Sequence, residues 1–164
     1  MPRMTVSVEP QVVRVMQIVV FALISGVVVF AVIAAILSHG KPPGDPFLAY
    51  IARGFAVLMI VLRSVIPRVI VASQAQQLTA GLNVENDEDV NDVVTRLCGA
   101  YQSRVIMENA MLEGAAFFNL IAYMQATHTW SLGVAAALLA IMAIAFPTRG
   151  KVEAWVNEQL EGMP

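Results

Sequence analysis

A run of 23 consecutive uncharged residues, from Val15 to Leu37, constrains this chain more than any other feature of its sequence. About 20 apolar residues in a helix cross the hydrocarbon core of a bilayer, whereas the apolar core of a signal peptide has about 7 to 15 residues. The run therefore predicts a transmembrane helix that stays in the protein, and not a signal peptide that is removed.

Three more apolar segments follow, and prolines mark several of their ends, because proline cannot continue a helix. We predict an all-α polytopic integral membrane protein in which residues 1–164 form a single membrane domain. Four transmembrane helices are expected at residues 15–37, 47–66, 103–125 and 130–147, with a cytoplasmic connection at 67–102 and a cytoplasmic tail at 148–164.

Composition and motifs exclude several classes of protein. The chain is 58% hydrophobic and 13% charged, whereas a soluble domain carries about 25% charged residues. A net charge of −2 gives no basic face for nucleic acid. The single cysteine, Cys98, cannot form a redox pair, and no nucleophile elbow, zinc-protease motif or phosphate-binding glycine loop is present. We therefore expect no enzymatic activity, no cofactor and no metal site.

Lysines and arginines predict the orientation, because these residues are retained on the cytoplasmic side of membrane proteins. With four spans, both termini and the 67–102 connection share one side, and that side holds eight of the ten positive residues. The exceptions are Lys41 and Arg53. We predict cytoplasmic N and C termini, and the uncleaved first span favours a bacterial inner membrane.

Residues 87–125 are expected to form one long helix that begins in the cytoplasm and continues as the third span. Its cytoplasmic half carries an apolar stripe at helical spacing, formed by Val90, Val94, Leu97 and Tyr101. We interpret this stripe as a surface for a cytoplasmic protein partner. A second short amphipathic helix follows the fourth span, with Val152, Trp155, Val156 and Leu160 on one face. That helix can lie on the membrane surface or pack on the cytoplasmic half of the third span.

Ionisable side chains inside the spans need an explanation, because each costs about 2.5 to 3.5 kcal/mol at the centre of a membrane helix. Counted from the span ends, Glu113 lies roughly 15 Å deep and Arg53 roughly 20 Å deep, which predicts that the two form an ion pair. Glu108 lies level with Arg63 and four residues after Arg104, so contacts to both are expected. The amides that also need partners in lipid are Asn109 and Asn119.

Two functions fit this pattern best. The first is a non-enzymatic structural or accessory membrane subunit, in a homo-oligomer or a larger membrane complex, with intramembrane ion pairs that fix helix contacts. The second is a small oligomeric proton or ion channel or transporter that uses Glu113. Pairing of Glu113 with Arg53 favours the first function, and an unpaired Glu113 in a wet cavity favours the second. A third alternative function is the binding of a lipid or small ligand in a pocket between the helices.

The transport reading has one architectural parallel. In length, number of spans and a single midplane glutamate, the chain resembles the four-helix proteolipid subunit of rotary ATPases, in which a buried carboxylate carries the ion. It lacks the duplicated hairpin and the last-span carboxylate of those subunits, so we assign it to no family.

Overall fold

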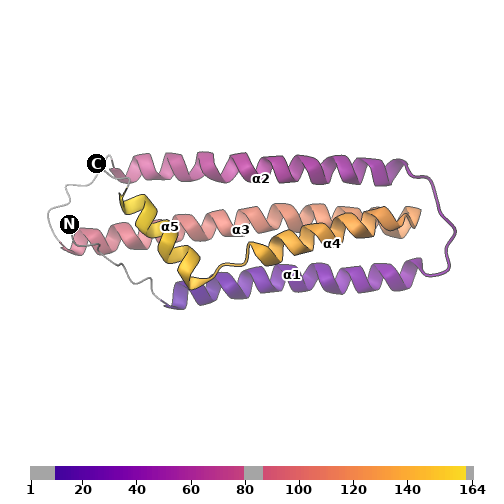
Figure 1. Ribbon diagram of the computed structural model, residues 1–164, viewed down its shortest axis with the longest axis horizontal. Coiled ribbons are helices and arrows are strands. Elements are labelled where there is room, and N and C mark those ends of the chain that lie inside the picture. Colours follow the sequence, from indigo (N-terminus) through magenta and orange to yellow (C-terminus); the bar gives the residue numbers. More distant parts are fainter. Residues whose placement is uncertain (1–9, 80–86, 162–164) are drawn as a thin grey trace.

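The computed structural model describes the backbone of residues 10–79 and 87–161. Within these ranges, the side chains of residues 67–68, 70–79, 87–93 and 160–161 lie outside the description. The described chain contains five helices and no strand, which confirms the all-helical prediction (Figure 1). The helices are α1 (Pro10–Ser38), α2 (Phe47–Thr79), α3 (Asp87–Ala126), α4 (Thr129–Ile144) and α5 (Arg149–Glu161).

Three of these helices are long and apolar enough to cross a membrane: α1, the Phe47–Ile66 part of α2, and the Val94–Ala126 part of α3. A fourth candidate combines α4 with α5, which meet at a bend of 68°. At 16 residues, α4 is shorter than the predicted 130–147 span. It ends before Pro147, where the Ala145 amide donates the closing hydrogen bond to the Ile141 carbonyl at 2.9 Å.

The long helix predicted at 87–125 is confirmed as α3, which is the central element of the fold. It packs against α1, α2 and α4, whereas the backbones of α1 and α2 do not approach each other in the described part of the chain. In Figure 1, α1 and α2 accordingly lie on opposite sides of the pair formed by α3 and α4. Helix α2 continues through Pro67 to Thr79, beyond the predicted span end at residue 66.

Alanines allow the spans to approach closely where they meet. The larger apolar core is formed by buried residues of α1 to α4, among them Val27 of α1, Ala56 of α2, Ala115 of α3 and Leu138 of α4. Small residues at such contacts bring helix backbones together and increase van der Waals contact, which is the main attraction between helices in lipid. Large side chains on the outside are apolar too, such as Phe21 and Val57, as expected for surfaces that face acyl chains.

One face of α3 is left uncovered because α1 and α2 stand apart. Gly99, Ser103, Ala110, Gly114 and Ile121 are exposed on this face, at intervals of four and seven residues. A Cβ atom added at Gly99 or Gly114 would meet nothing within 4 Å. The third span therefore presents a narrow strip of mostly small residues between two flanking helices.

Helix α5 folds back against the N-terminal part of α3 and the start of α1. Val152, Trp155 and Val156 are buried there together with residues of the other two helices: Val13, Met16, Leu97, Cys98 and Ala100. The rings of Tyr101 and Trp155 lie 5.1 Å apart. The sequence allows the last helix to lie on the membrane surface or to pack on the third span. In the structure it packs on α3.

This packing corrects the predicted partner surface. Leu97 is 2% exposed, and Tyr101 packs on Trp155, so α5 and α1 cover residues that were expected to face a cytoplasmic protein. Val94 is partly buried against the same cluster, and the side chain of Val90 lies outside the described residues. The apolar stripe is real, but its described part is buried within the chain, because the sequence of α5 carries a complementary apolar face.

Candidate functional site

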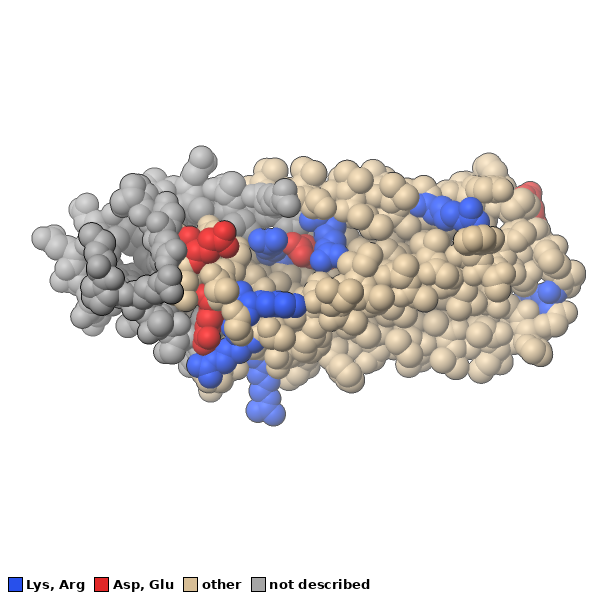
Figure 2. All heavy atoms as spheres, viewed as in Figure 1, with Lys and Arg blue, Asp and Glu red and all other residues tan. Residues whose placement is uncertain are grey.

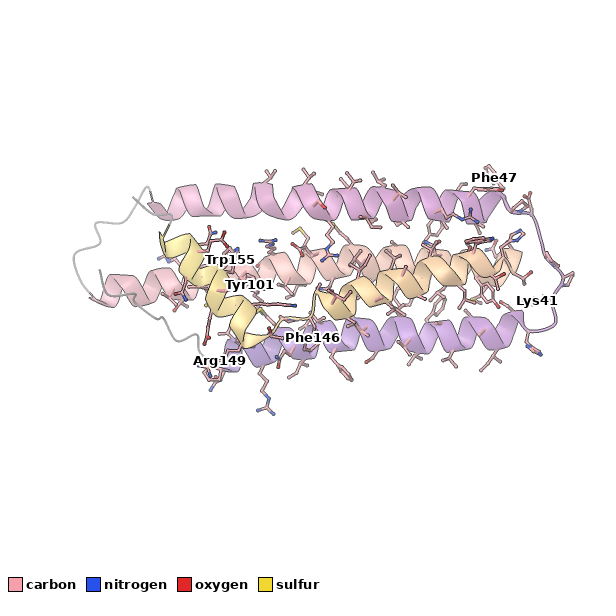
Figure 3. The ribbon with its side chains drawn as sticks, in the orientation of Figure 1. Lys41, Phe47, Tyr101, Phe146, Arg149 and Trp155 are labelled. Atoms are coloured by element: carbon pink, nitrogen blue, oxygen red, sulfur yellow. The ribbon has the colours of Figure 1, made fainter. Side chains whose placement is uncertain are left out.

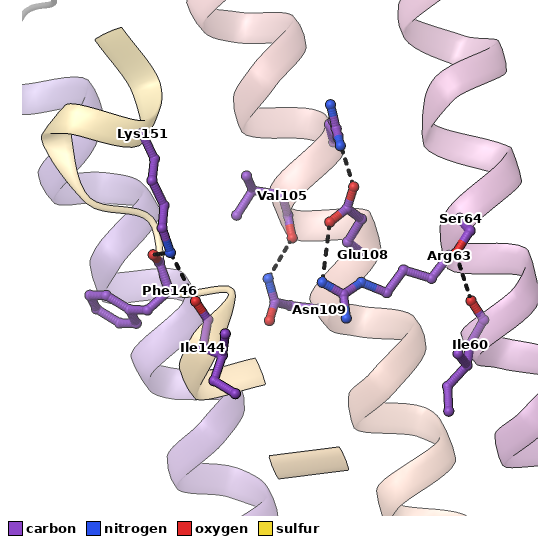
Figure 4. A network of polar contacts seen from close by, with 10 residues as sticks. Ile60, Arg63, Ser64, Val105, Glu108, Asn109, Ile144, Phe146 and Lys151 are labelled. Atoms are coloured by element: carbon purple, nitrogen blue, oxygen red, sulfur yellow. Dashed lines mark hydrogen bonds and ion pairs between the residues drawn. The ribbon is translucent and has the colours of Figure 1, made fainter. Parts of the chain in front are cut away.

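Glu108 joins two helices near the polar end of the bundle. Its carboxylate accepts a hydrogen bond from Arg104 Nε at 2.8 Å, one turn earlier on α3, and lies 3.5 Å from Arg63 Nη2 on α2 (Figure 4). The Glu108 side chain is 15% exposed and that of Arg63 is 20% exposed. Both contacts expected from depth and spacing are present, so the carboxylate is neutralised from two sides.

Charged side chains gather at this end of the molecule. Figure 2 shows blue and red side chains clustered beside α5, while the middle of the same face is mostly tan. On α5 itself, Arg149 Nε donates to Glu153 at 2.7 Å, on the exposed side of the helix. This distribution is what a bundle needs if its middle lies in hydrocarbon and this end lies among headgroups.

Asn119 holds α3 to the backbone of α2. The side chain is fully buried, and its amide donates to the Ala52 carbonyl at 3.1 Å and to the Ala115 carbonyl of its own helix at 2.9 Å. Asn109 is 1% exposed and donates to the Val105 carbonyl at 2.8 Å. The Oδ1 atoms of both asparagines are buried without a hydrogen-bond partner in the described structure. An amide in lipid gains by such bonds, because no water is available there.

The contacts of Glu108 and Asn119 fix one register between α2 and α3. From Ala52 to Arg63 is eleven residues along α2, and from Asn119 back to Glu108 is eleven residues along α3. The two helices are antiparallel, so both contacts belong to the same alignment. A residue on α2 is therefore placed opposite a defined residue on α3 over the length of the span.

This register rules out the predicted ion pair between Arg53 and Glu113, which is wrong. Arg53 lies one residue beyond Ala52, whereas Glu113 lies six residues from Asn119. The mismatch of five residues is about 7 to 8 Å at 1.5 Å per residue. No ion pair or hydrogen bond joins Arg53 or Glu113 to any side chain that the structure describes.

The two residues have different surroundings. The Arg53 guanidinium lies over the Tyr50 ring, 5.2 Å from its centroid, and its Nε is buried without a hydrogen-bond partner. Glu113 turns toward α1 instead: its Oε1 lies 3.7 Å from the position of a Cβ atom built at Gly26. The absence of a side chain at Gly26 leaves room for this carboxylate.

A cavity of about 270 Å³ lies at the polar end, between α3 and the bend that joins α4 to α5. Its lining residues are Tyr101, Arg104, Val105, Glu108, Asn109, Ala145, Lys151 and Trp155. Lys151 Nζ donates to the Ile144 carbonyl at 2.8 Å and to the Phe146 carbonyl at 3.1 Å (Figure 4). Figure 3 shows Tyr101 and Trp155 at the same end, where α5 crosses α3.

Sequence reasoning missed Lys151 and Trp155 as members of this site. A lysine shortly after a helix end is a recognisable signal, because it can bind the last carbonyls of that helix. Pro147 signals the break between α4 and α5, but no residue signals the angle that brings Lys151 and Asn109 to the same cavity. Among the described residues, no group of three His, Cys, Asp or Glu side chains is placed to hold a metal ion.

Comparison with known proteins identifies no matching family model, no similar curated protein and no similar solved structure for this chain.

A double-mutant cycle distinguishes the contact that forms from the one that does not. For Arg63→Met and Glu108→Gln we expect a coupling free energy of about 0.5 to 3 kcal/mol, because the side chains touch. For Arg53→Met and Glu113→Gln the effects should add within about 0.3 to 0.5 kcal/mol. Unfolding of the four single and two double variants in detergent measures both. Coupling between Arg53 and Glu113 would contradict the observed register.

Proposed function

We propose that this chain is a non-enzymatic membrane protein that crosses the bilayer four times and serves as a structural or accessory subunit of a membrane assembly. The observation that carries the proposal is the use of Glu108 and Asn119. Both side chains are costly in lipid. Each makes a contact from α3 to α2, and together the two contacts hold the helices at a single register. Polar groups that fix helix contacts are typical of a structural role.

In this proposal α1, the first part of α2, α3 and α4 are the four spans. The bend after α4 then places α5, as an amphipathic helix, at the surface of the membrane on the same side as the start of α1. The excess of positive residues on that side supports a cytoplasmic location for it, and the membrane of the proposal is a bacterial inner membrane.

The uncovered face of α3 supports an assembled state. Small exposed residues such as Ala110 and Gly114 allow another helix to approach the backbone closely. Glu113 is adjacent in sequence to Gly114 and has no charge partner among the described residues. A transmembrane helix from a second copy or another subunit, laid along this face, would cover the small residues of α3 next to Glu113, whose carboxylate itself faces Gly26 of α1. The cytoplasmic partner of the proposal docks on the outer surface of α5 and α3, since their inner faces are already paired.

Photochemical cross-linking tests the assembled state. In a Cys98→Ala background, a benzophenone attached to Gly114→Cys should link the chain to one protein partner in native membranes. A cysteine at Gly114 fits, because a Cβ there meets nothing within 4 Å. Val57→Cys is the matched control, since Val57 is 62% exposed on the outer side of α2. Mass spectrometry of the adducts identifies the partner as a second copy or another protein.

Linkage to lipid alone at both positions would contradict an assembly on the α3 face. Equal protein adducts from both positions would contradict it as well, because they indicate random encounters in the membrane.

The second candidate function, proton or ion transport, is favoured by one observation: Glu113 lacks a counterion. A charged carboxylate without a partner inside a membrane is a typical feature of ion pathways. Transport would require Glu113 to face a water-filled cavity. The lining of the cavity described above does not include Glu113. We therefore place transport second.

Flux measurements separate the two functions. The structural function predicts that vesicles containing wild type and Glu113→Gln conduct protons and Na⁺ at the same basal rate. Glu153→Gln, which changes a carboxylate on the exposed side of α5, is the control. A flux that is lost in Glu113→Gln and kept in Glu153→Gln would replace the structural function by transport.

A further inference from the structure

The cavity at the polar end is small, polar on one side and aromatic on the other. Its volume of about 270 Å³ holds about nine water molecules at roughly 30 Å³ each. Pockets for drug-sized ligands begin at about 300 Å³. The cavity therefore suits a headgroup-sized molecule. It lies where the apolar part of α4 ends, next to Ile144, whose side chain is 76% exposed.

Cationic hydrogen-bond donors remain unsatisfied in the lining. Arg104 uses Nε for Glu108, and its two amino groups make no hydrogen bond to the described residues. Lys151 uses two of its three N–H groups for the carbonyls of Ile144 and Phe146. Glu108, the carboxylate of the lining, is already bound by Arg104 and by Arg63. The cluster of three cations and one carboxylate keeps a positive charge, and arginine with lysine favours phosphate oxygens.

The buried Oδ1 atom of Asn109 adds a second requirement for a ligand of this cavity, which is a hydrogen-bond donor. Asn109 is 1% exposed, and its Oδ1 is buried without a partner while its amide is bound to the Val105 carbonyl. An unpaired buried acceptor costs about 1 to 3 kcal/mol, so a ligand with an O–H donor gains if its entry turns the Asn109 amide and opens Oδ1 to the cavity. The phosphate of a phosphodiester offers no such donor, whereas a hydroxyl group next to it does.

Aromatic side chains form the wall opposite the helix bend. Trp155 is 9% exposed and packs on Tyr101, with ring centroids 5.1 Å apart. Such a wall covers the carbon skeleton of a polyol and leaves its oxygens to the polar side. Because Trp155 and Lys151 both come from α5, a ligand in this cavity would also hold α5 in its bent position.

From these observations we propose that the cavity binds a phosphate ester that carries a neighbouring hydroxyl group, with the glycerophosphate headgroup of an anionic phospholipid as its occupant. Arg104 and Lys151 hold the phosphate oxygens, and Asn109 Oδ1 accepts a hydrogen bond from the glycerol hydroxyl. Basic pockets at the ends of membrane helices bind anionic headgroups by this chemistry. The acyl chains leave along the exposed apolar surface next to Ile144.

Lipid titration tests the proposal on the full-length chain in neutral detergent. Phosphatidylglycerol should raise the unfolding temperature and remain bound in native mass spectrometry. Phosphatidylcholine, whose headgroup has no O–H or N–H donor and no net charge, should do neither. Soluble glycerol 1-phosphate is the third ligand, and it separates a lipid occupant from a free phosphate ester of the same chemistry.

Variants of α5 locate the binding. Lys151→Gln should weaken phosphatidylglycerol binding by about tenfold or more, because a charge-assisted hydrogen bond is lost. Lys151→Arg should retain most of the affinity. Arg149→Gln is the matched control, since Arg149 lies on the same helix outside the lining and should bind as wild type does.

Each outcome decides the matter. Preference for phosphatidylglycerol that is lost in Lys151→Gln supports the lipid occupant. Binding of glycerol 1-phosphate with the same dependence on Lys151 supports the site and assigns it to a soluble ester. Equal effects of phosphatidylglycerol and phosphatidylcholine on wild type would overturn the proposal, and this comparison holds even if Lys151→Gln does not fold. Full affinity in Lys151→Gln would overturn it as well.

Discussion

The contact of Glu108 with Arg63 and Arg104 is the interaction on which the rest of this structure depends. A carboxylate within a membrane helix costs about 2.5 to 3.5 kcal/mol when it is uncompensated, so its two cationic neighbours determine where the helix that carries it can lie. Arg63 belongs to α2, and its position fixes α2 against α3. Asn119 repeats this constraint at the opposite end of the span, by bonding the Ala52 carbonyl.

The position of α3 in turn places the other elements. Alanines at its contacts with α1, α2 and α4 let all three approach it closely. Its N-terminal part gives α5 an apolar face on which to fold back. That return brings Lys151 and Trp155 over the turn of α3 that holds Arg104 and Glu108, so the cavity forms beside the ion pair.

Much of this could be predicted from the sequence, because hydrophobic runs and helical spacing are local signals. The four apolar segments, the long third helix and the contacts of Glu108 all follow from residue spacing. The pairing of Arg53 with Glu113 failed because each depth was counted separately from an uncertain span end. The pair needs an alignment five residues away from the one that brings Arg63 to Glu108, so straight antiparallel helices cannot form both. The cavity depends on the 68° bend before α5; Pro147 predicts a break there, but the angle is set by the packing of α5 on α3 and α1.

Disulfide trapping measures the alignment of α2 with α3 most directly. In a Cys98→Ala background, the pair Ala56→Cys and Ala115→Cys should form a disulfide on mild oxidation, since both residues are buried and lie opposite each other in the observed register. The pair Ala56→Cys and Ala110→Cys should remain reduced, because five residues of helix, about 7 to 8 Å along the axis, separate the two levels and a disulfide tolerates Cα separations only up to about 7 Å. Rapid oxidation of the second pair and not the first would contradict the account, since it would align Arg53 with Glu113 instead.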